Sequence, residues 1–428
     1  MREGRHGVLI VGASQAGIQM ACSLRELGFD DPITVVGAEI HPPYQRPPLS
    51  KALLSGSLSA ADLIFRSDDF YREMRIDLVL GERVTDIRRD GGTAGRAITE
   101  SGRVLPFDRL ALAVGVRARR LDIDGAEADG VLYLRDADDA RELKARLELA
   151  ADVVVIGGGF IGLEVAASAS KLGKKVTVLC AGPRLMARAV GERTSDFFAQ
   201  AHRSRGVDVR LNAGIASIRH AGTRVTGVTL ADGSVVRADV VVVGIGAVPR
   251  VELAHQLGLV TDDGIVVDEF SLASDGVTVA SGDCANFPNP LPTRHGPERF
   301  RLESVNNAVE HAKVAAATLA GYAVPYRAIP WFWSDQFDIK LQVAGVSSGC
   351  DSTVTRGDPA AGKFSVLYFV GDQLVAADCV NSPVDFLAVK SILAAERTVP
   401  KDRADDASVP LKKLSVDPAT SHIGASAL

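Results

Sequence analysis

Two short apolar runs set the pattern of the first 170 residues, residues 8–11 and residues 153–156. Each run is rich in β-branched residues, ends at closely spaced glycines and leads into a stretch with helical character. A buried strand, a tight turn and a helix have this pattern. After the first run we predict a helix from Gln15 to Gly28 and a second strand at 33–36, so residues 7–36 read as a β-α-β unit.

The remaining sequence predicts both helices and strands, and its hydrophobic pattern changes near residue 326. Alternating apolar and polar positions after 326 favour an antiparallel sheet, followed by a helix over Val384–Glu396. Earlier segments predict a helix at 69–74 and strands near 77–80 and 83–87. A turn-rich hairpin follows and leads into a further strand that ends in AVG. An alanine-rich amphipathic helix is predicted within 301–320.

The glycines of the two turns have separate physical tasks. Gly12 allows the sharp turn after the first strand, Gly17 allows the helix to pack closely on the sheet, and Ser14 takes the middle position, where glycine admits a pyrophosphate. Glu39 follows at about the twenty-residue distance of an acid that accepts from a ribose hydroxyl. We interpret this unit as a dinucleotide site, with a bare α/β turn as the alternative.

The second turn has all three glycines, Gly157, Gly159 and Gly162, but Cys180 stands where the acid is expected. A carboxylate would accept from a 2′-hydroxyl and repel a 2′-phosphate, and a neutral cysteine does neither. Arg184 and Arg188 follow and could favour a 2′-phosphate, although solvated arginines are the commoner reading. The choice between NADH and NADPH therefore stays open.

The loop of residues 41–54 contains four prolines, which hold it extended. We predict that a helix starts over Leu49–Leu54 with Ser50 as a possible cap. Arg46 and Lys51 could place positive charge on a flavin or its phosphates, and a solvated basic loop is the alternative.

Two strands that end in AVG (113–115) and GIG (244–246) bracket residues 118–247, which we read as an inserted domain. Farther on, the pair Gly282-Asp283 ends a strand beside a helix. Asp283 either contacts the ligand or caps the next segment.

Composition narrows the possible functions. The formal net charge of −5 argues against a nucleic-acid partner, and no apolar run is long enough for a membrane span. The five cysteines form no CxxC pair, which gives no local redox disulfide and no zinc spacing, so no metal is predicted. No secretory signal is recognisable, and we expect a cytoplasmic protein.

The segments GASQAG, PYQRPPLSKALL, GGGFIGLE, GIGAVP, SGDCA, RLESVNNA and PWFWSDQ occur in one order. Over residues 7–415 the chain thereby resembles the FAD-dependent ferredoxin reductases of bacterial oxygenase systems, the putidaredoxin, palustrisredoxin and rhodocoxin reductase type. The resemblance implies an α/β, glutathione-reductase-like fold with two Rossmann-type nucleotide-binding domains and a C-terminal α+β domain. The implied boundaries are 1–117 with 248–325 for FAD, 118–247 for NAD(P)H, 326–415 for the C-terminal domain and 416–428 for a disordered tail.

The resemblance also implies site residues. With the turn residues already described, those expected at a non-covalently bound FAD are Gly12, Ser14, Ala16, Gly17, Ala38, Glu39, Arg46, Lys51, Val84, Ala113, Gly115, Arg135, Asp283, Val305 and Trp333. Those expected at NADH are Gly157, Gly159, Phe160, Ile161, Gly162, Glu164, Gly244 and Gly246. Lys51 matches a lysine near the flavin N5 and Trp333 a tryptophan close to the isoalloxazine. The departures from the family pattern are Ser14, the segment AVG in place of ATG, and Cys180.

The implied reaction passes electrons from NADH through FAD to a [2Fe–2S] ferredoxin that serves an oxygenase, with the protein as a monomer. We predict that Lys51 and Glu164 approach each other, and we expect Lys51, Glu164 and Trp333 to act in catalysis. Alternatives are a rubredoxin reductase, an NADH oxidase or flavin disulfide reductase, and a redox-sensing binding protein like apoptosis-inducing factor. The disulfide reductases need a cysteine in the loop beside the flavin, and residues 37–54 contain none.

Overall fold

A computed structural model describes residues 5–291 and 296–418. The chain divides into two compact units. The first contains residues up to Gln45, Ala61–Arg117 and Val248–Pro330, and the second contains Arg46–Ala60, Ala118–Ala247 and the chain from Trp331 onward.

The first unit is built on a five-stranded parallel sheet in the order β19-β7-β1-β2-β3. Its strands are β1 (Val8–Val11), β2 (Ile33–Gly37), β3 (Ile76–Leu80), β7 (Arg109–Leu112) and β19 (Val279–Ala280). The central strand β1 is buried at every position and pairs with β2 and β7, which explains its continuous apolar run.

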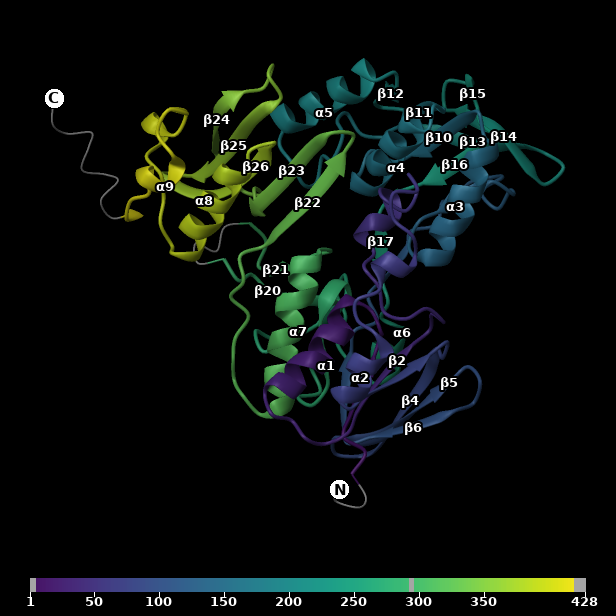
Figure 1. Cartoon of the computed structure of the whole chain (residues 1–428), viewed down its shortest axis with the longest axis vertical. Coiled ribbons are helices and arrows are strands. Elements are labelled where there is room, and N and C mark those ends of the chain that lie inside the picture. Colours follow the sequence, from purple (N-terminus) through teal and green to yellow (C-terminus); the bar gives the residue numbers. More distant parts are fainter. Residues whose placement is uncertain (1–4, 292–295, 419–428) are drawn as a thin grey trace. The chain divides into compact units, whose positions relative to one another are not determined.

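Two helices of the first unit, α1 (Gln15–Glu26) and α7 (Val305–Ala320), lie side by side (Figure 1). Small buried residues such as Ala16, Ala308 and Ala312 let them approach closely. The Ser304 side chain accepts from the backbone N–H of Asn307 and so caps α7, and Gly321 ends the helix at a φ of 90°.

Smaller elements complete this unit. The antiparallel sheet comprises β4 (Val84–Gly91), β5 (Ala94–Thr99) and β6 (Val104–Phe107). The other elements are η2 (Ala61–Leu63), α2 (Asp68–Glu73), α6 (Glu252–Gln256), β18 (Ile265–Val266), η3 (Gly282–Cys284), β20 (Ala285–Pro288) and β21 (Arg299–Phe300). The strands β8 (Val116–Ala118) and β17 (Ala247–Pro249) lie where the chain passes between the units.

The second unit contains another parallel sheet, in the order β12-β11-β10-β16-β9. Its strands are β9 (Val131–Tyr133), β10 (Asp152–Ile156), β11 (Lys175–Leu179), β12 (Asp208–Arg210) and β16 (Val240–Val243). Its helices are α3 (Ala137–Leu149), α4 (Phe160–Lys171) and α5 (Glu192–Ser204), and its antiparallel strands are β13 (Ile215–Ala221), β14 (Arg224–Leu230) and β15 (Val235–Arg237). The two strand–glycine–helix units predicted from the sequence are thus confirmed as β1–α1 and β10–α4.

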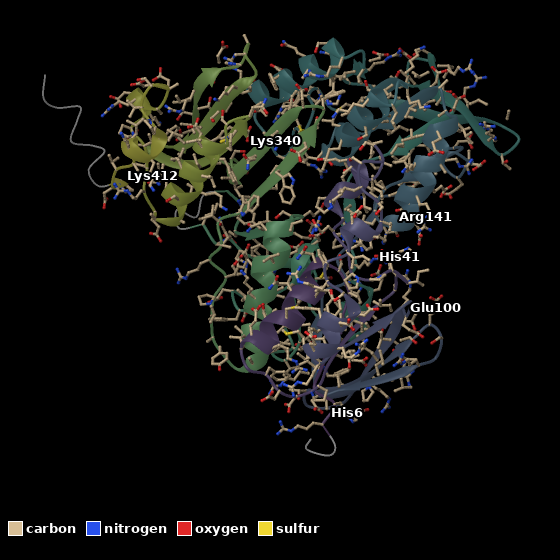
Figure 2. The ribbon with its side chains drawn as sticks, viewed as in Figure 1. His6, His41, Glu100, Arg141, Lys340 and Lys412 are labelled. Carbon is tan, nitrogen blue, oxygen red and sulfur yellow. The ribbon has the colours of Figure 1, made fainter. Side chains whose placement is uncertain are left out.

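The antiparallel sheet predicted after residue 326, and the helix that follows it, are also confirmed. An antiparallel sheet in the order β22-β23-β26-β25-β24 packs against α8 (Pro383–Ala394). Its strands are β22 (Trp331–Gln336), β23 (Ile339–Gly345), β24 (Ser352–Asp358), β25 (Lys363–Val370) and β26 (Gln373–Val380), and η4 (Lys401–Arg403) and α9 (Leu411–Leu414) follow. Charged side chains such as Arg141, Lys340 and Lys412 are exposed (Figure 2).

The helix predicted over Leu49–Leu54 is wrong. A 3₁₀ turn, η1 (Pro47–Ser50), stands there instead, because Pro47 and Pro48 begin the turn and the segment after Lys51 continues as further turns. The cap predicted at Ser50 is absent for the same reason, since Arg46 precedes the turn.

The domain boundaries inferred from the sequence remain predictions. Residues 419–428 of the predicted tail lie outside the described residues. Across residues 5–291 and 296–418, no helix is both long and apolar enough to cross a membrane.

Candidate functional site

The glycines of the first turn are required by the fold of the first unit. A Cβ on Gly12, whose φ is 121°, would lie 2.1 Å from the carbonyl oxygen of Ala113. A Cβ on Gly17 would lie 1.8 Å from the carbonyl oxygen of Gly12. Side chains at these two positions would therefore separate β1, α1 and the end of β7. Ser14, which precedes the first residue of α1, has extended backbone angles that any residue can adopt.

The second turn repeats this geometry and explains the serine of the first. A Cβ on Gly157 would lie 2.2 Å from the oxygen of Gly244, and one on Gly162 would lie 2.6 Å from the oxygen of Gly157. A Cβ on Gly159 would lie 3.9 Å from its nearest neighbour, an ordinary van der Waals distance, so a side chain fits at this position without any shift. The middle position is therefore free of packing constraints, which makes serine at position 14 compatible with the same backbone. The open middle position at the amino end of a helix fits an approaching pyrophosphate.

Three predicted FAD contacts of the first unit meet at one end of its sheet. A Cβ on Gly282 would lie 3.0 Å from the Cβ of Ala16, so η3 packs on the start of α1. Asp283 belongs to η3, which also packs against α7, and Val305 is the first residue of α7. The structure thus brings Ala16, Asp283 and Val305 to neighbouring elements.

The other predicted residues of the first unit lie around the same sheet. Glu39 is half-buried after β2, and its carboxylate accepts from the hydroxyl of Tyr44 at 2.5 Å, while Ala38 is exposed. Val84 is half-buried at the start of β4. Ala113 and Gly115 follow β7, where the Ala113 carbonyl lies against Gly12.

Cys180 is buried directly after β11. Its thiol contacts the carbonyl oxygen of Arg184 at 3.7 Å. The guanidinium of Arg184 donates to the carbonyls of Val190 and Ala187 at 2.6 and 2.7 Å, so it holds its own loop together. Arg188 is exposed, and one of its nitrogens would lie 3.2 Å from a Cβ on Gly246. Of the two arginines considered for a 2′-phosphate, Arg184 thus stabilises its own loop through these hydrogen bonds.

An ion pair in the second unit confirms that Lys51 and Glu164 approach each other. The ammonium of Lys51 lies 2.6 Å from Oε2 of Glu164, and the two side chains are 19% and 6% exposed. Glu164 is held by α4, four residues beyond the start of that helix, and Lys51 follows η1. A carboxylate this deeply buried needs partners, because an unpaired buried charge is costly.

Two serines complete the surroundings of this carboxylate, and the sequence reasoning missed both roles. The Ser50 hydroxyl donates to Oε2 of Glu164 at 2.5 Å, and the Ser334 hydroxyl donates to Oε1 at 2.7 Å. The backbone of Ser50 is also fixed, since its carbonyl accepts from the Ser168 hydroxyl of α4 at 2.8 Å. Ser334 belongs to the FWSDQ segment, which was the one sequence signal that could have pointed to it.

Of the remaining predicted residues of the second unit, Phe160 and Ile161 begin α4, Trp333 lies on β22, and Arg46 and Arg135 lie in loops. Arg46 donates to the carbonyl oxygen of Arg135 at 2.8 Å, which brings these two predicted FAD contacts together. Trp333 is half-buried on β22, with its ring 5.7 Å from that of Trp331. The Phe160 ring packs edge-on against Phe332 at 4.8 Å, and Ile161 is 48% exposed.

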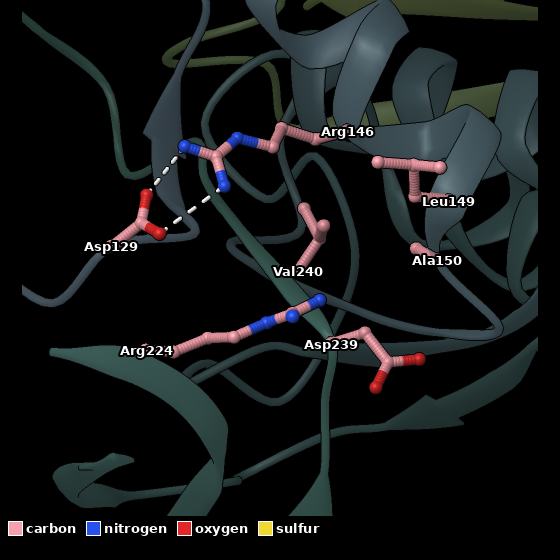
Figure 3. A pocket seen from close by; sticks show the side chains of 7 residues that line it. All are labelled: Asp129, Arg146, Leu149, Ala150, Arg224, Asp239 and Val240. Carbon is pink, nitrogen blue, oxygen red and sulfur yellow. Dashed lines mark hydrogen bonds and ion pairs between the residues drawn. The ribbon is translucent and has the colours of Figure 1, made fainter. Parts of the chain in front are cut away.

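A small surface pocket of the second unit lies elsewhere, within residues 129–240. It is lined by Asp129, Arg146, Leu149, Ala150, Arg224, Asp239 and Val240 (Figure 3). Val240 begins β16, whereas the glycine turn lies at the carboxyl ends of the strands, where α/β sheets bind their ligands. Arg146 is already paired with Asp129. We therefore do not assign the dinucleotide to this pocket.

The cysteines do not form a redox centre. All five, Cys22, Cys180, Cys284, Cys350 and Cys379, are free thiols. Burial raises the pKa of Cys284 to about 11 and also raises the pKa of Cys379. A thiol with a raised pKa stays protonated at neutral pH and is a poor nucleophile. Burial also raises the pKa of Cys22 and of Cys350, and none of the five thiols is paired with another.

Comparisons with known proteins agree with this architecture. Residues 6–312 match the pyridine nucleotide-disulphide oxidoreductase family, and residues 331–415 match the reductase C-terminal family. Rhodocoxin reductase of Rhodococcus erythropolis is 44% identical over 405 residues, which cover 95% of this chain and 93% of the relative. Putidaredoxin reductase of Pseudomonas putida is 41% identical, over 95% and 96% of the two chains. A rubredoxin-NAD(+) reductase of Ectopseudomonas oleovorans is 37% identical, over 88% and 96%.

Solved structures give the same result. The ferredoxin reductase for the CYP199A2 system from Rhodopseudomonas palustris has a TM-score of 0.91 at 40% identity, and the match covers 96% of this chain and all of that one. Putidaredoxin reductase in its covalent complex with putidaredoxin has a TM-score of 0.90 at 40% identity, over 95% and 97% of the chains. These matches confirm the predicted fold class. The chain belongs to the pyridine nucleotide-disulphide oxidoreductase family, and within it to the ferredoxin reductases of the rhodocoxin and putidaredoxin reductase type.

Proposed function

We propose that this chain oxidises NADH at a bound FAD and passes the electrons to a [2Fe–2S] ferredoxin that supplies a bacterial oxygenase. The observation that carries the proposal is a pair of strand–glycine–helix turns, one in each unit, in a chain whose five cysteines are unpaired thiols. Each turn has its middle position, Ser14 or Gly159, outside the packed core.

The residues of the first unit fit FAD. The turn from Gly12 to Gly17 would hold its pyrophosphate at the amino end of α1, and Glu39 would accept from a ribose hydroxyl. Ala16, Ala38, Val84, Ala113, Gly115, Asp283 and Val305 are the further contacts proposed here. When bound, FAD supplies hydride acceptance from NADH and release of electrons one at a time.

In the second unit we assign NADH to the turn Gly157–Gly162, with Phe160, Ile161, Glu164, Gly244 and Gly246 around it. Glu164 holds the Lys51 ammonium at 2.6 Å. A lysine fixed in this way would stabilise the negative charge that a flavin gains when it is reduced. Arg46, Arg135 and Trp333 are proposed as further FAD contacts, and Trp333 as the side chain near which the ferredoxin docks. Cys180 provides no carboxylate that would repel a 2′-phosphate, so NADPH is a substrate to compare.

A rubredoxin is the second candidate acceptor, because a relative that covers most of this chain is named a rubredoxin-NAD(+) reductase. We place the protein in the cytoplasm, where the NADH pool and the reducing conditions suit five free thiols.

The purified protein is expected to be yellow and to contain one FAD per chain. Anaerobic NADH should bleach the flavin in a stopped-flow spectrometer, and NADPH should be compared in the same experiment. Cytochrome c reduction should require an added [2Fe–2S] ferredoxin, with a rubredoxin as the competing acceptor. The proposal would be wrong if the protein takes up no flavin, or if neither NADH nor NADPH bleaches the bound flavin.

A further inference from the structure

A chain of buried hydrogen bonds leads from helix α5 to the Glu164 carboxylate. Nε2 of His202 lies 2.8 Å from Oε1 of Gln336, and Nε2 of Gln336 donates to the Ser334 hydroxyl at 3.2 Å. The Ser334 hydroxyl then donates to Oε1 of Glu164 at 2.7 Å. His202, Gln336 and Ser334 are fully buried.

The direction of this chain is fixed by its chemistry. An amide oxygen can only accept, so His202 must donate from Nε2, and the amide nitrogen of Gln336 must donate to Ser334. The Ser334 hydroxyl, whose oxygen is already engaged as an acceptor, directs its proton at the carboxylate. Burial lowers the pKa of His202, so the ring is neutral at pH 7 and keeps this tautomer.

The arrangement holds both oxygens of the carboxylate. Oε1 accepts from Ser334, while Oε2 accepts from Ser50 and Lys51. Lys51 is the more exposed partner of the ion pair, with 19% of its side chain accessible compared with 6% for Glu164. The buried partners therefore fix the carboxylate from behind, and the carboxylate in turn fixes a lysine that can still reach solvent.

We propose that Ser334, held by Gln336 and His202, is a positioning residue that sets the orientation of Glu164 and, through it, of the Lys51 ammonium. The inference rests on the proposed function, because it assigns to these residues the alignment of Lys51 for hydride transfer. It extends the site from the two nucleotide-binding segments to strand β22 and helix α5.

The test compares the FAD-loaded wild type with Ser334→Ala. The limiting rate of flavin reduction by NADH should fall about tenfold, the effect of one hydrogen bond to a charged group, while the NADH concentration for half-maximal rate changes little. Lys51 should also acetylate faster with trace acetic anhydride, measured by mass spectrometry without NADH, because a loosened ion pair leaves its amine more reactive. Ser334→Thr, which keeps the hydroxyl, should restore most of both properties.

A double-mutant cycle asks whether Ser334 acts through Glu164. In a Glu164→Gln background, Ser334→Ala should add little further loss, since the carboxylate that it orients is gone. Ser365→Ala is the matched control, because Ser365 is also fully buried in this sheet and donates to a carboxylate, that of Asp385, at 2.9 Å. It should leave the rate and the Lys51 labelling unchanged.

The proposal is overturned if Ser334→Ala slows reduction equally in both backgrounds, if Ser365→Ala has the same effect, or if Lys51 labelling does not change. Should Ser334→Ala fail to fold, Gln336→Met removes the donor to Ser334 and is judged by the same readouts. Failure of the proposed function looks different: the wild type itself would then not be reduced by NADH, while Lys51 labelling would still report on the hydrogen-bond chain.

Discussion

Asp378 is a carboxyl group buried in β26, against the amino end of α5. Its Oδ2 accepts from the Tyr368 hydroxyl at 2.5 Å and from the backbone N–H of Gly191 at 3.3 Å. Its Oδ1 is buried without a partner among the described residues. Burial raises the pKa of Asp378 from 3.8 to about 6, because the charged form loses more hydration than these donors replace.

This residue predicts a pH dependence of stability. The folded carboxyl binds its proton more tightly than the unfolded one, so its contribution to stability is present below about pH 4 and is lost as the pH rises through about 6. The change amounts to roughly 3 kcal/mol from the usual value per pKa unit. Asp378→Asn should therefore gain stability relative to the wild type between pH 4 and pH 7, as measured by thermal unfolding. The exposed Asp405→Asn should track the wild type, and a constant difference for Asp378→Asn would contradict the argument.

Single residues of the candidate site differ in how far the sequence could predict them. The approach of Lys51 and Glu164 was predictable because both are charged residues of recognisable motifs. The donors Ser50 and Ser334 were not, because a hydroxyl carries no charge and follows no periodicity, and its partner depends on tertiary packing. The roles of individual residues toward FAD and NADH remain predictions.

Among the elements, those with a clear hydrophobic pattern or a glycine turn were predictable. Strands β1 and β10 are buried on both faces, which gives each a continuous apolar run, and α1 follows from the glycine turn. Strand β24 was not expected, because its sequence is polar and its positions are mostly half-buried or exposed. The 3₁₀ turn η1 was misread as a helix start because the contact that holds Ser50 comes from α4, far away in the sequence.

The two kinds of glycine in the second turn predict separable effects. Gly162→Ala should destabilise the protein, because its Cβ would lie 2.6 Å from the carbonyl oxygen of Gly157. Gly159→Ala should fold normally, because a Cβ there would lie 3.9 Å from the nearest atom. It should weaken NADH binding only a few-fold, because Ser14 shows that a turn of this kind can carry a Cβ at the middle position. Thermal unfolding and NADH titration of both variants separate these outcomes. Equal loss of stability in both would show that the turn is not open at Gly159.

For the whole molecule, the free thiols predict how many electrons it stores. A flavin with a redox-active disulfide would take four electrons, whereas this chain should take two, that is, one NADH per FAD in an anaerobic titration. Thiol counts in denaturant, before and after reduction, should both be five. A second equivalent of NADH consumed with new thiols exposed would instead indicate a disulfide reductase.

Membership of the two compact units was beyond sequence reasoning. Residues 46–60 belong to the second unit although they lie between two segments of the first. What ties them there is a set of side-chain contacts with α4, such as those of Ser50 and Lys51 with Glu164. Such contacts join positions more than a hundred residues apart and leave no local pattern.

Strand β22 has unlike partners on its two faces. Phe332, Ser334 and Gln336 face the rings and carboxylate of α4 and α5, while Trp331 packs with Trp333 and with Phe386 of α8. Neighbouring side chains of a strand point in opposite directions. One inserted or deleted residue would therefore turn the two tryptophan rings toward α4 and α5, and the Ser334 hydroxyl and Gln336 amide toward α8. Natural variation in WFWSDQ should accordingly consist of replacements that keep its length, and the segment should be inherited as a block.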